Sequence, residues 1–185
     1  MAGVKVEITS DVAPKLRGLI DGLEHPAPLF GQINEYLLRS TRARFKTQTS
    51  PSGVPWAPLS PAYKKRKRRN SNRILVLNGY LSGTLRGQHD DEGLEFGSDR
   101  VYAAIQQLGG TIKRKASKRD VYFKQNRDGS VGNRFVKKSK SNFAQSVNVG
   151  SYEIKIPSRE FLGTNEKDDK HIIKLAQRFL KNTMQ

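Results

Sequence analysis

The sequence predicts an α+β fold in which a small antiparallel sheet packs against a long helix and a C-terminal helix. Three observations predict this class. Apolar residues recur at helical spacing in two stretches near the ends of the chain, and short segments between turn signals alternate apolar with polar residues. At 185 residues the chain is long enough for one domain with a core and short for two. We therefore expect a single domain over residues 1–185, with a projecting basic β-hairpin arm inserted at about 113–150.

The first part of the chain predicts one strand and two helices. Val4, Val6 and Ile8 alternate with polar residues, which is typical of a half-buried strand. Helical spacing then predicts a first helix up to the proline-containing break at 25–28, and a longer second helix that ends before the turn-rich stretch 49–53. The stripe positions are Val12, Leu16, Leu19, Ile20 and Leu23 in the first helix and Phe30, Ile33, Leu37, Thr41 and Phe45 in the second.

Prolines dominate the next segment. Residues 53–61 contain three of them around Trp56, so this segment is predicted to be extended or looped. Trp56 is the only Trp of the chain. On a stiff loop its side chain can either plug the edge of the core or anchor an interface.

Short elements follow up to residue 110. Residues 74–85 predict a short helix or turn that can bury four leucines, and residues 85–97 predict a hairpin around an acidic turn. Residues 102–108 predict a short helix, which Gly109 and Gly110 close with a left-handed cap. The four leucines are Leu75, Leu77, Leu81 and Leu85.

The inserted arm and a last helix complete the predicted fold. Residues 121–123 and 134–136 flank the turn 127–130, which predicts a projecting hairpin with few apolar residues to bury and an order that depends on binding to other subunits. The alternating segment 152–156 predicts a strand that returns to the core. A helix with Asn165 as its N-cap should follow and pack on the sheet. Its apolar face holds Ile172, Leu175, Ala176, Phe179 and Leu180.

Charge indicates the class of partner. The chain has 34 Lys and Arg against 17 Asp and Glu, a net charge of +17, which favours polyanions such as nucleic acid or acidic protein surfaces. The basic residues concentrate in 64–69 and 113–140, and contact through them would be sequence-independent and salt-sensitive. The alternative is that such a run is a solvated loop. The candidate contacts with DNA or an acidic surface are Lys64, Lys65, Arg66, Lys67, Arg68, Arg69, Lys113, Arg114, Lys115, Lys137 and Lys138.

Residue types with catalytic chemistry are scarce. The chain has no Cys, which excludes disulfides and thiolate metal sites, and its three His residues lie in different segments. Asp168 and His171 could share a helix face and bind a metal, but one pair of ligands is not a site. We therefore expect no enzyme activity, no cofactor and no metal. No apolar run approaches the roughly 20 residues of a membrane helix, so no membrane partner is expected either.

Four short blocks occur in one order along the chain, and together they resemble the phage virion morphogenesis family. This family includes tail-completion proteins of P2-like phages and a minor head-tail protein of Mu-like phages. The resemblance covers the chain except residues 113–150, and family members typically carry His where this chain has Gln106. The blocks are Phe45 with Pro51, Gly53, Trp56, Pro58, Leu59, Ser60 and Pro61; then Ile74, Leu75, Gly79 and Leu81; then the run 102–110; and the run 156–163.

The resemblance implies a structural component of the virion neck, made in the host cytoplasm. Such a protein would form a ring, with six as the common number on the tail side, and would meet portal or adaptor proteins, tail terminator or tube proteins, and genomic DNA. The alternative is a non-specific DNA-binding protein or an assembly factor absent from the mature virion. Arg159 is expected to pair with Glu160, Glu35 or a neighbour's carboxylate. The candidate core-edge or subunit-contact residues are Trp56, Pro58, Leu59, Arg159 and Phe161.

Overall fold

A computed structural model describes residues 12–184, so the strand predicted at 4–8 lies outside the described residues. The chain divides into two compact units. Unit 1 contains the described residues up to Gly109 together with the segment from Pro157 onward, and unit 2 is Gly110–Ile156. Helices and short antiparallel strands make up the structure, which confirms the α+β class.

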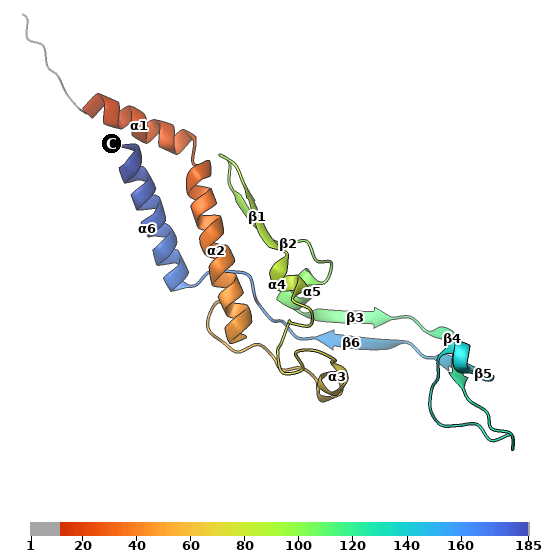
Figure 1. Ribbon diagram of the computed structural model, residues 1–185. Helices are drawn as coiled ribbons and strands as arrows, with labels where there is room; N and C mark the ends of the chain where they lie inside the picture. The colour runs from red at the N-terminus through yellow and green to blue at the C-terminus, as the bar shows by residue number, and fades with distance from the viewer. Residues whose placement is uncertain (1–11, 185) are drawn as a thin grey trace, which may run out of the picture. The chain divides into compact units, whose positions relative to one another are not determined.

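Three helices form one side of unit 1: α1 (Val12–Glu24), α2 (Ala27–Thr47) and α6 (Glu166–Thr183) (Figure 1). All three were predicted at these places. Helix α6 begins at a capping box, in which the Asn165 side chain accepts a hydrogen bond from the Asp168 N–H and the Asp168 carboxylate accepts one from the Asn165 N–H. The prediction that this helix packs on the sheet is wrong, because its half-buried stripe contacts α1 and α2.

Two glycines allow α1 to approach α6 closely. A Cβ atom at Gly18 would lie 1.9 Å from the carbonyl oxygen of Thr183, and one at Gly22 would lie 2.7 Å from the Thr183 Cγ2 atom. Helix α1 therefore meets α6 through its glycine edge. Its apolar stripe faces elsewhere, because the glycines lie roughly 120° around the helix from the stripe. The stripe members with large exposed side chains in the structure include Leu16, Ile20 and Leu23.

A hairpin covers another face of α2. Strands β1 (Leu85–His89) and β2 (Leu94–Ser98) pair antiparallel, as predicted. The carboxylate of Asp90 accepts hydrogen bonds from the backbone N–H groups of Glu92 and Gly93, which shapes the acidic turn. The strands contact α2, so that this helix lies between the hairpin and α6.

The segment before this hairpin differs in detail from its prediction. Helix α4 (Tyr80–Gly83) is short, and Leu81 is buried as expected, but Leu77 is 43% exposed. Leu75 adopts a left-handed backbone conformation with φ 57°, so Val76 enters the core in place of Leu77. After the hairpin, α5 (Ala103–Leu108) ends at Gly109 as predicted. The predicted left-handed cap is wrong, because Gly109 combines a positive φ of 73° with an extended ψ of -174°.

The core of unit 1 gathers around the C-terminal half of α2. Phe161 is fully buried, and its ring lies 5.6 Å from that of Phe45, which in turn meets the Trp56 ring edge-on at 5.4 Å. Helix α3 (Pro61–Arg66) lies outside this cluster. The buried members of the core are Phe45, Trp56, Val76, Leu81, Leu85, Ala103 and Phe161.

Unit 2 consists of two antiparallel ribbons and a 3-10 turn. Strand β3 (Gly110–Arg114) pairs with β6 (Tyr152–Ile156), β4 (Ser117–Phe123) pairs with β5 (Phe143–Val149), and η1 (Lys138–Lys140) precedes β5. Segment 152–156 is therefore a strand, as predicted, but it belongs to unit 2 rather than to the core. Most of its side chains are exposed.

The predicted pairing of 121–123 with 134–136 is wrong. Phe123 pairs with Phe143, and residues 134–136 lie in the loop between them, where the Val136 N–H donates to the Tyr122 carbonyl at 2.8 Å. The predicted turn is confirmed, since the Asn126 N–H donates to the Ser130 carbonyl and Gly129 has φ 83°. Charged strands with few apolar residues specify their register weakly, which explains the error.

Within residues 12–184, no helix combines the length and the apolar character that a membrane span requires.

Candidate functional site

Three of the four sequence blocks meet in space around residues 158–162, and Leu81 of the remaining block belongs to the same buried core as Phe161. Three hydrogen bonds hold this segment between α5 and the Trp56 loop. The Arg159 N–H donates to the Gln106 carbonyl at 2.8 Å, the Ser158 hydroxyl donates to the Gln107 carbonyl at 2.7 Å, and the Trp56 indole N–H donates to the Glu160 carbonyl at 2.8 Å. Blocks that lie up to about a hundred positions apart in the chain thus build one structural junction.

Gln107 fixes the path of this segment. Its side-chain oxygen accepts hydrogen bonds from the Phe161 N–H at 2.9 Å and the Leu162 N–H at 3.0 Å, and its side-chain nitrogen donates to the Leu162 carbonyl at 3.1 Å. One amide therefore satisfies three backbone groups beside the buried Phe161 ring. Gln107 belongs to the sequence run 102–110, but this role did not follow from residue type; its position in the last turn of a helix that precedes two glycines was the available signal.

Arg159 binds carbonyl oxygens rather than carboxylates. The side chain is 7% exposed, and it donates to the Ala57 carbonyl at 2.8 Å and to the Pro58 carbonyl at 3.1 Å. Its remaining bond goes to the side-chain oxygen of Gln106 at 3.3 Å. The predicted pairing with Glu160 or Glu35 is wrong, because the proline-containing loop presents carbonyl groups that a guanidinium can satisfy. Gln106 thus uses its amide at the position where family members typically have His.

The five candidate interface residues fall into two groups. Trp56, Arg159 and Phe161 are buried in the chain's own core, at 4%, 7% and 0% exposure. Pro58 is exposed and Leu59 is half-buried. A role of these residues at a subunit interface stays a prediction, and of the five only Pro58 and Leu59 have accessible side-chain surface.

A buried ion pair joins α2 to α6. The Arg44 guanidinium donates to the Asp168 carboxylate at 2.6 Å and to the Gly163 carbonyl at 2.6 Å, and the Tyr36 and Ser40 hydroxyls donate to the same carboxylate at 2.7 and 2.8 Å. Burial and the hydrogen bond to Asp168 raise the pKa of Tyr36 to about 12, so this hydroxyl remains a donor.

The ion pair between Arg44 and Asp168 also explains why Asp168 and His171, the candidate metal ligands, do not form a metal site. Asp168 is saturated by Arg44, Tyr36 and Ser40, while the His171 ring stacks on the Tyr36 ring with 4.1 Å between centroids. In the described part of the chain, no three His, Cys, Asp or Glu side chains are placed to hold a metal ion together.

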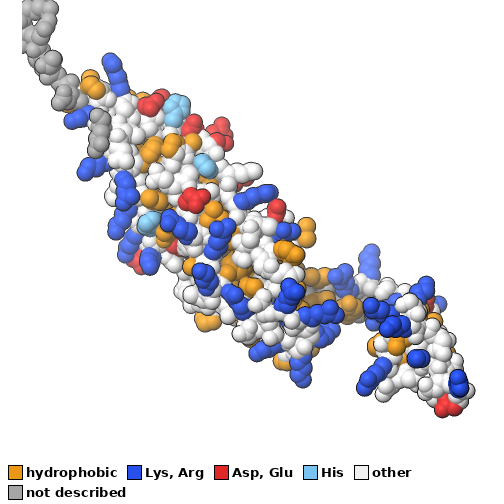
Figure 2. All heavy atoms as spheres, viewed as in Figure 1, with side chains coloured by type: hydrophobic (Ala, Val, Ile, Leu, Met, Phe, Trp, Pro, Cys, Tyr) orange, Lys and Arg blue, Asp and Glu red, His pale blue; other side chains and the backbone are white. Residues whose placement is uncertain are grey.

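The first basic run is more ordered than a solvated loop. Residues 61–66 form helix α3, with the Ser60 hydroxyl accepting from the Tyr63 N–H at its start. Lys64, Lys65 and Arg66 are exposed on this helix, and Arg68 and Arg69 are exposed beyond it. Figure 2 shows Lys and Arg side chains over the visible face of the molecule.

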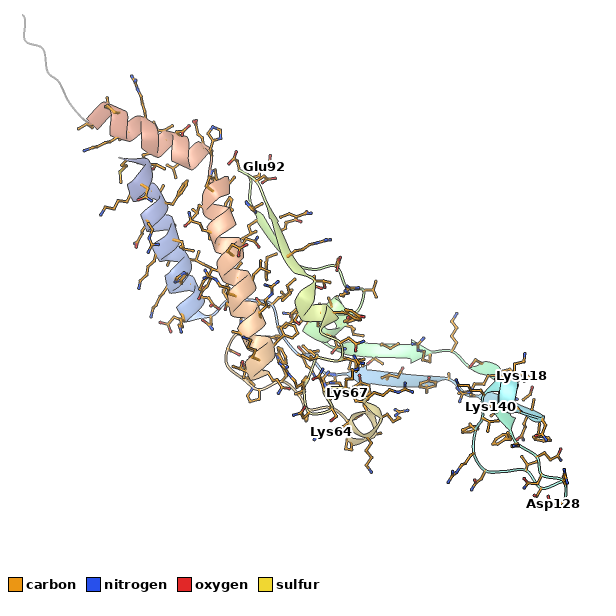
Figure 3. The ribbon with its side chains drawn as sticks, viewed as in Figure 1. Lys64, Lys67, Glu92, Lys118, Asp128 and Lys140 are labelled. Atoms are coloured by element: carbon orange, nitrogen blue, oxygen red, sulfur yellow. The ribbon has the colours of Figure 1, made fainter. Side chains whose placement is uncertain are left out.

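Lys67 is the exception in this run. Lys67, which Figure 3 labels, is 9% exposed. Its ammonium group donates to the Arg73 carbonyl. Burial, with the positive charge of Arg73, lowers its pKa. Lys67 therefore stabilises the fold. Its prediction as a contact with DNA or an acidic surface is wrong, because its ammonium group is buried.

Unit 2 carries the second basic group on exposed positions. Lys113 and Arg114 lie on β3, Lys115 follows that strand, and Lys137 and Lys138 lie at the start of η1. Lys113 approaches Glu153 across the ribbon at 3.8 Å, an exposed pair of small energetic value. These five side chains remain accessible to a polyanionic partner.

Comparison with known families decides the assignment. The sequence profile of the phage virion morphogenesis family matches residues 8–181. The chain belongs to the phage virion morphogenesis family. The match spans nearly the whole chain, including the segment 113–150 that the four blocks leave out. No curated protein and no solved structure matches the chain.

In this member of the phage virion morphogenesis family, the four blocks share a structural role. Three of the side chains they supply, those of Trp56, Gln107 and Arg159, bind backbone groups of neighbouring segments. The blocks therefore hold one fold together, and the protein takes part in virion morphogenesis.

Proposed function

We propose that this protein is a structural neck or tail-completion component, which forms a ring at the head-tail junction and enables head-tail joining. The observation that carries the proposal is the pair of exposed apolar surfaces on unit 1, in a chain whose family builds virions. The protein acts by contact rather than by catalysis, and its place is the neck or tail region of the virion.

The first apolar surface is the stripe on α1. Leu16 is 52% exposed, Ile20 53% and Leu23 61%. These side chains lie on one face of the helix, three or four positions apart, and the close contact of α1 with α6 leaves them in solvent. A row of large apolar side chains that the chain does not bury favours a protein partner.

The second apolar surface surrounds α4 and α5. Val101 is 100% exposed, Leu108 77% and Tyr80 60%. Helix α1 and these residues are different surfaces of the same chain, which suits a heterologous contact between identical subunits. Heterologous contacts close into rings when the rotation between subunits permits it. A six-fold ring is the form we propose, as for similar proteins of the tail side.

The exposed basic residues supply a second candidate function, non-specific DNA binding or a role as an assembly factor. Lys64, Lys65 and Arg66 on α3 and the basic positions of unit 2 are accessible. In a neck ring they would meet genomic DNA, the portal or adaptor, or the tail terminator or tube. A protein that acts only by binding DNA would be missing from purified virions.

Mass spectrometry on purified virions, tails and heads tests the proposal. A neck component is expected at a ring-like copy number in virions and in one of the two half-particles. Absence from virions would contradict it and favour the assembly factor. Native mass spectrometry on the purified protein, alone and with portal or tail proteins, then gives the size of the ring and its partner.

A further inference from the structure

Helix α6 carries a row of basic side chains that composition alone does not reveal. They recur every three or four positions, which places them on one face of the helix. The row covers about 21 Å of helix axis at about 1.5 Å per residue. All of its members are exposed, and this α6 row is Lys167, Lys170, Lys174, Arg178 and Lys181.

The α6 row is separate from the face that packs. The half-buried stripe of α6, which includes Ile172, Leu175 and Phe179, turns toward α1 and α2. The α6 row lies on a different side of the helix from this stripe. Its cations therefore take no part in the packing of α6 against α1 and α2. In Figure 2, Lys and Arg side chains follow the edge of the molecule where Figure 1 shows α6.

Few carboxylates neutralise the α6 row. Lys170 pairs with Glu166 at 2.5 Å, where both side chains are mostly exposed and the pair is weak. The buried carboxylate of Asp168, on the same helix, pairs with Arg44 and not with the row. In the described residues, the other four members of the row make no ion pair. Their charge is available to a partner.

The start of the row borders an open hollow of about 460 Å³. Lys167, Lys170 and Lys174 line it together with the carboxylate of Glu166, which pairs with Lys170, and the stacked rings of Tyr36 and His171 lie beside them. The hollow gives the three ammonium groups a recess in which an anionic group can approach more than one of them.

We propose that the α6 row binds the sugar–phosphate backbone of duplex DNA. The phosphates of a DNA strand form a continuous row of negative charges, and a row of cations about 21 Å long can lie against several of them. A straight row of evenly spaced cations fits a linear polyanion better than the discrete carboxylates of an acidic protein surface. Lysine ammonium groups on flexible stems act as point charges and require no base sequence.

The inference deepens the second candidate function, DNA binding, by naming a surface that would carry it, and it does not depend on ring formation. Binding to DNA is measured on the purified full chain, whereas the neck role is measured on particles. Failure of one does not decide the other.

The test is fluorescence anisotropy of a labelled duplex of mixed sequence, titrated with the protein over a series of salt concentrations. The variant changes Lys167, Lys170, Lys174, Arg178 and Lys181 to Gln. The slope of log K against log salt is expected to become shallower by about 0.9 for each cation that lies against a phosphate, and by up to about 4.5 for all five. A matched control changes five exposed basic residues that lie outside the α6 row and outside the candidate DNA contacts to Gln, which removes the same charge; they are Lys15, Arg17, Arg42, Lys46 and Arg86.

Each outcome decides the proposal. A shallower slope for the α6 variant, with a smaller change for the control variant and recovery when the four lysines of the row become Arg, supports it. Equal changes for both variants would show that net charge alone drives binding, and would overturn it. Failure of the wild type to bind duplex DNA would overturn it too, as would unchanged DNA binding with lost binding to an acidic virion protein. Thermal unfolding checks that both variants fold.

Discussion

At the scale of single residues, side-chain groups that bind backbone or buried partners decide the structure. Gln107 satisfies three backbone groups, Arg159 binds two loop carbonyls, and Asp168 accepts from three side chains. None of these roles follows from residue type and spacing, because each partner lies more than 50 positions away in the sequence. The sequence could therefore place Arg159 near the core without identifying its partners.

Asp168→Asn should destabilise the fold strongly. The change leaves the buried Arg44 guanidinium without its counter-charge, and removal of one partner of a buried pair costs about 3–5 kcal/mol. Urea unfolding of the purified protein measures the loss. Asp169→Asn is the matched control, since Asp169 is an exposed carboxylate in the same helical turn and its loss should cost below about 0.5 kcal/mol. Equal stability of the two variants would contradict the role of the pair.

Acid should weaken the same site. Burial alone raises the pKa of Asp168, but hydrogen bonds from Tyr36 and Ser40 and the charge of Arg44 outweigh it and leave this pKa lowered. A carboxyl group whose pKa is lowered by folding stabilises the fold above its unfolded value of about 4, and this contribution is lost as the pH falls below that value.

The melting temperature of the wild type should therefore fall steeply below about pH 4, and that of Asp168→Asn should fall less steeply. Thermal unfolding followed by circular dichroism over an acid series gives both slopes. Parallel slopes would mean that other carboxylates dominate the acid sensitivity.

Gln106 and Gln107 should respond differently to substitution. Gln107→Leu leaves the N–H groups of Phe161 and Leu162 without their acceptor, at about 1–3 kcal/mol for each buried group. Gln106→His, which introduces the residue typical of the family, loses a single long side-chain bond and keeps the backbone bond to Arg159, so it should cost below about 1 kcal/mol. Urea unfolding compares the two, and the reverse order would contradict this description of the junction.

At the scale of elements, the helices could be predicted and the pairing of unit 2 could not. Helices α1, α2 and α6 follow from apolar stripes, proline breaks and the Asn165 cap, which are local signals. Strand pairing in unit 2 depends on register, and alternating charged residues leave several registers nearly equal. The basic run at 64–69 could be predicted as a charged surface, but not the burial of Lys67, because Arg73 supplies its acceptor from beyond the helix.

Substitutions in and after α3 can show whether its basic residues act in assembly without contributing to stability. Changing Lys64, Lys65, Arg66, Arg68 and Arg69 to Gln should leave the free energy of unfolding nearly unchanged, since all five side chains are exposed. We expect fewer joined particles from a phage that carries this variant, because the surface loses its charge. The yield of infectious particles measures this. Joined particles at normal yield would remove the proposed role of α3.

Lys67→Gln is the matched comparison for that variant. It removes the ammonium group that binds the Arg73 carbonyl, so it should lower the free energy of unfolding by about 1–3 kcal/mol. Its effect on particle yield should follow its effect on stability.

At the scale of the whole molecule, the family match and the exposed apolar surfaces point to assembly with other subunits. The α+β class was predictable from the sequence. The exposed faces of α1 were not, because an apolar stripe in a sequence indicates burial without showing whether the chain itself or a neighbour provides the cover. Only the glycine contact with α6 reveals that the stripe faces elsewhere.

Substitution of the α1 stripe should separate assembly from folding. Leu16→Asp with Ile20→Asp changes two exposed side chains, so the monomer should fold, while a ring that buries them should fall apart. Size-exclusion chromatography with light scattering measures the mass. Lys15→Ser with Arg17→Ser is the matched control on the same helix and should keep the wild-type mass. An unchanged mass for the Asp variant would exclude the stripe from the ring contact.

Electron microscopy of particles made without this protein tests the central claim most directly. A neck component that enables joining predicts separate, complete heads and tails, which form infectious virions again when the wild-type protein is supplied. Joined virions at normal yield in its absence would contradict the proposed function.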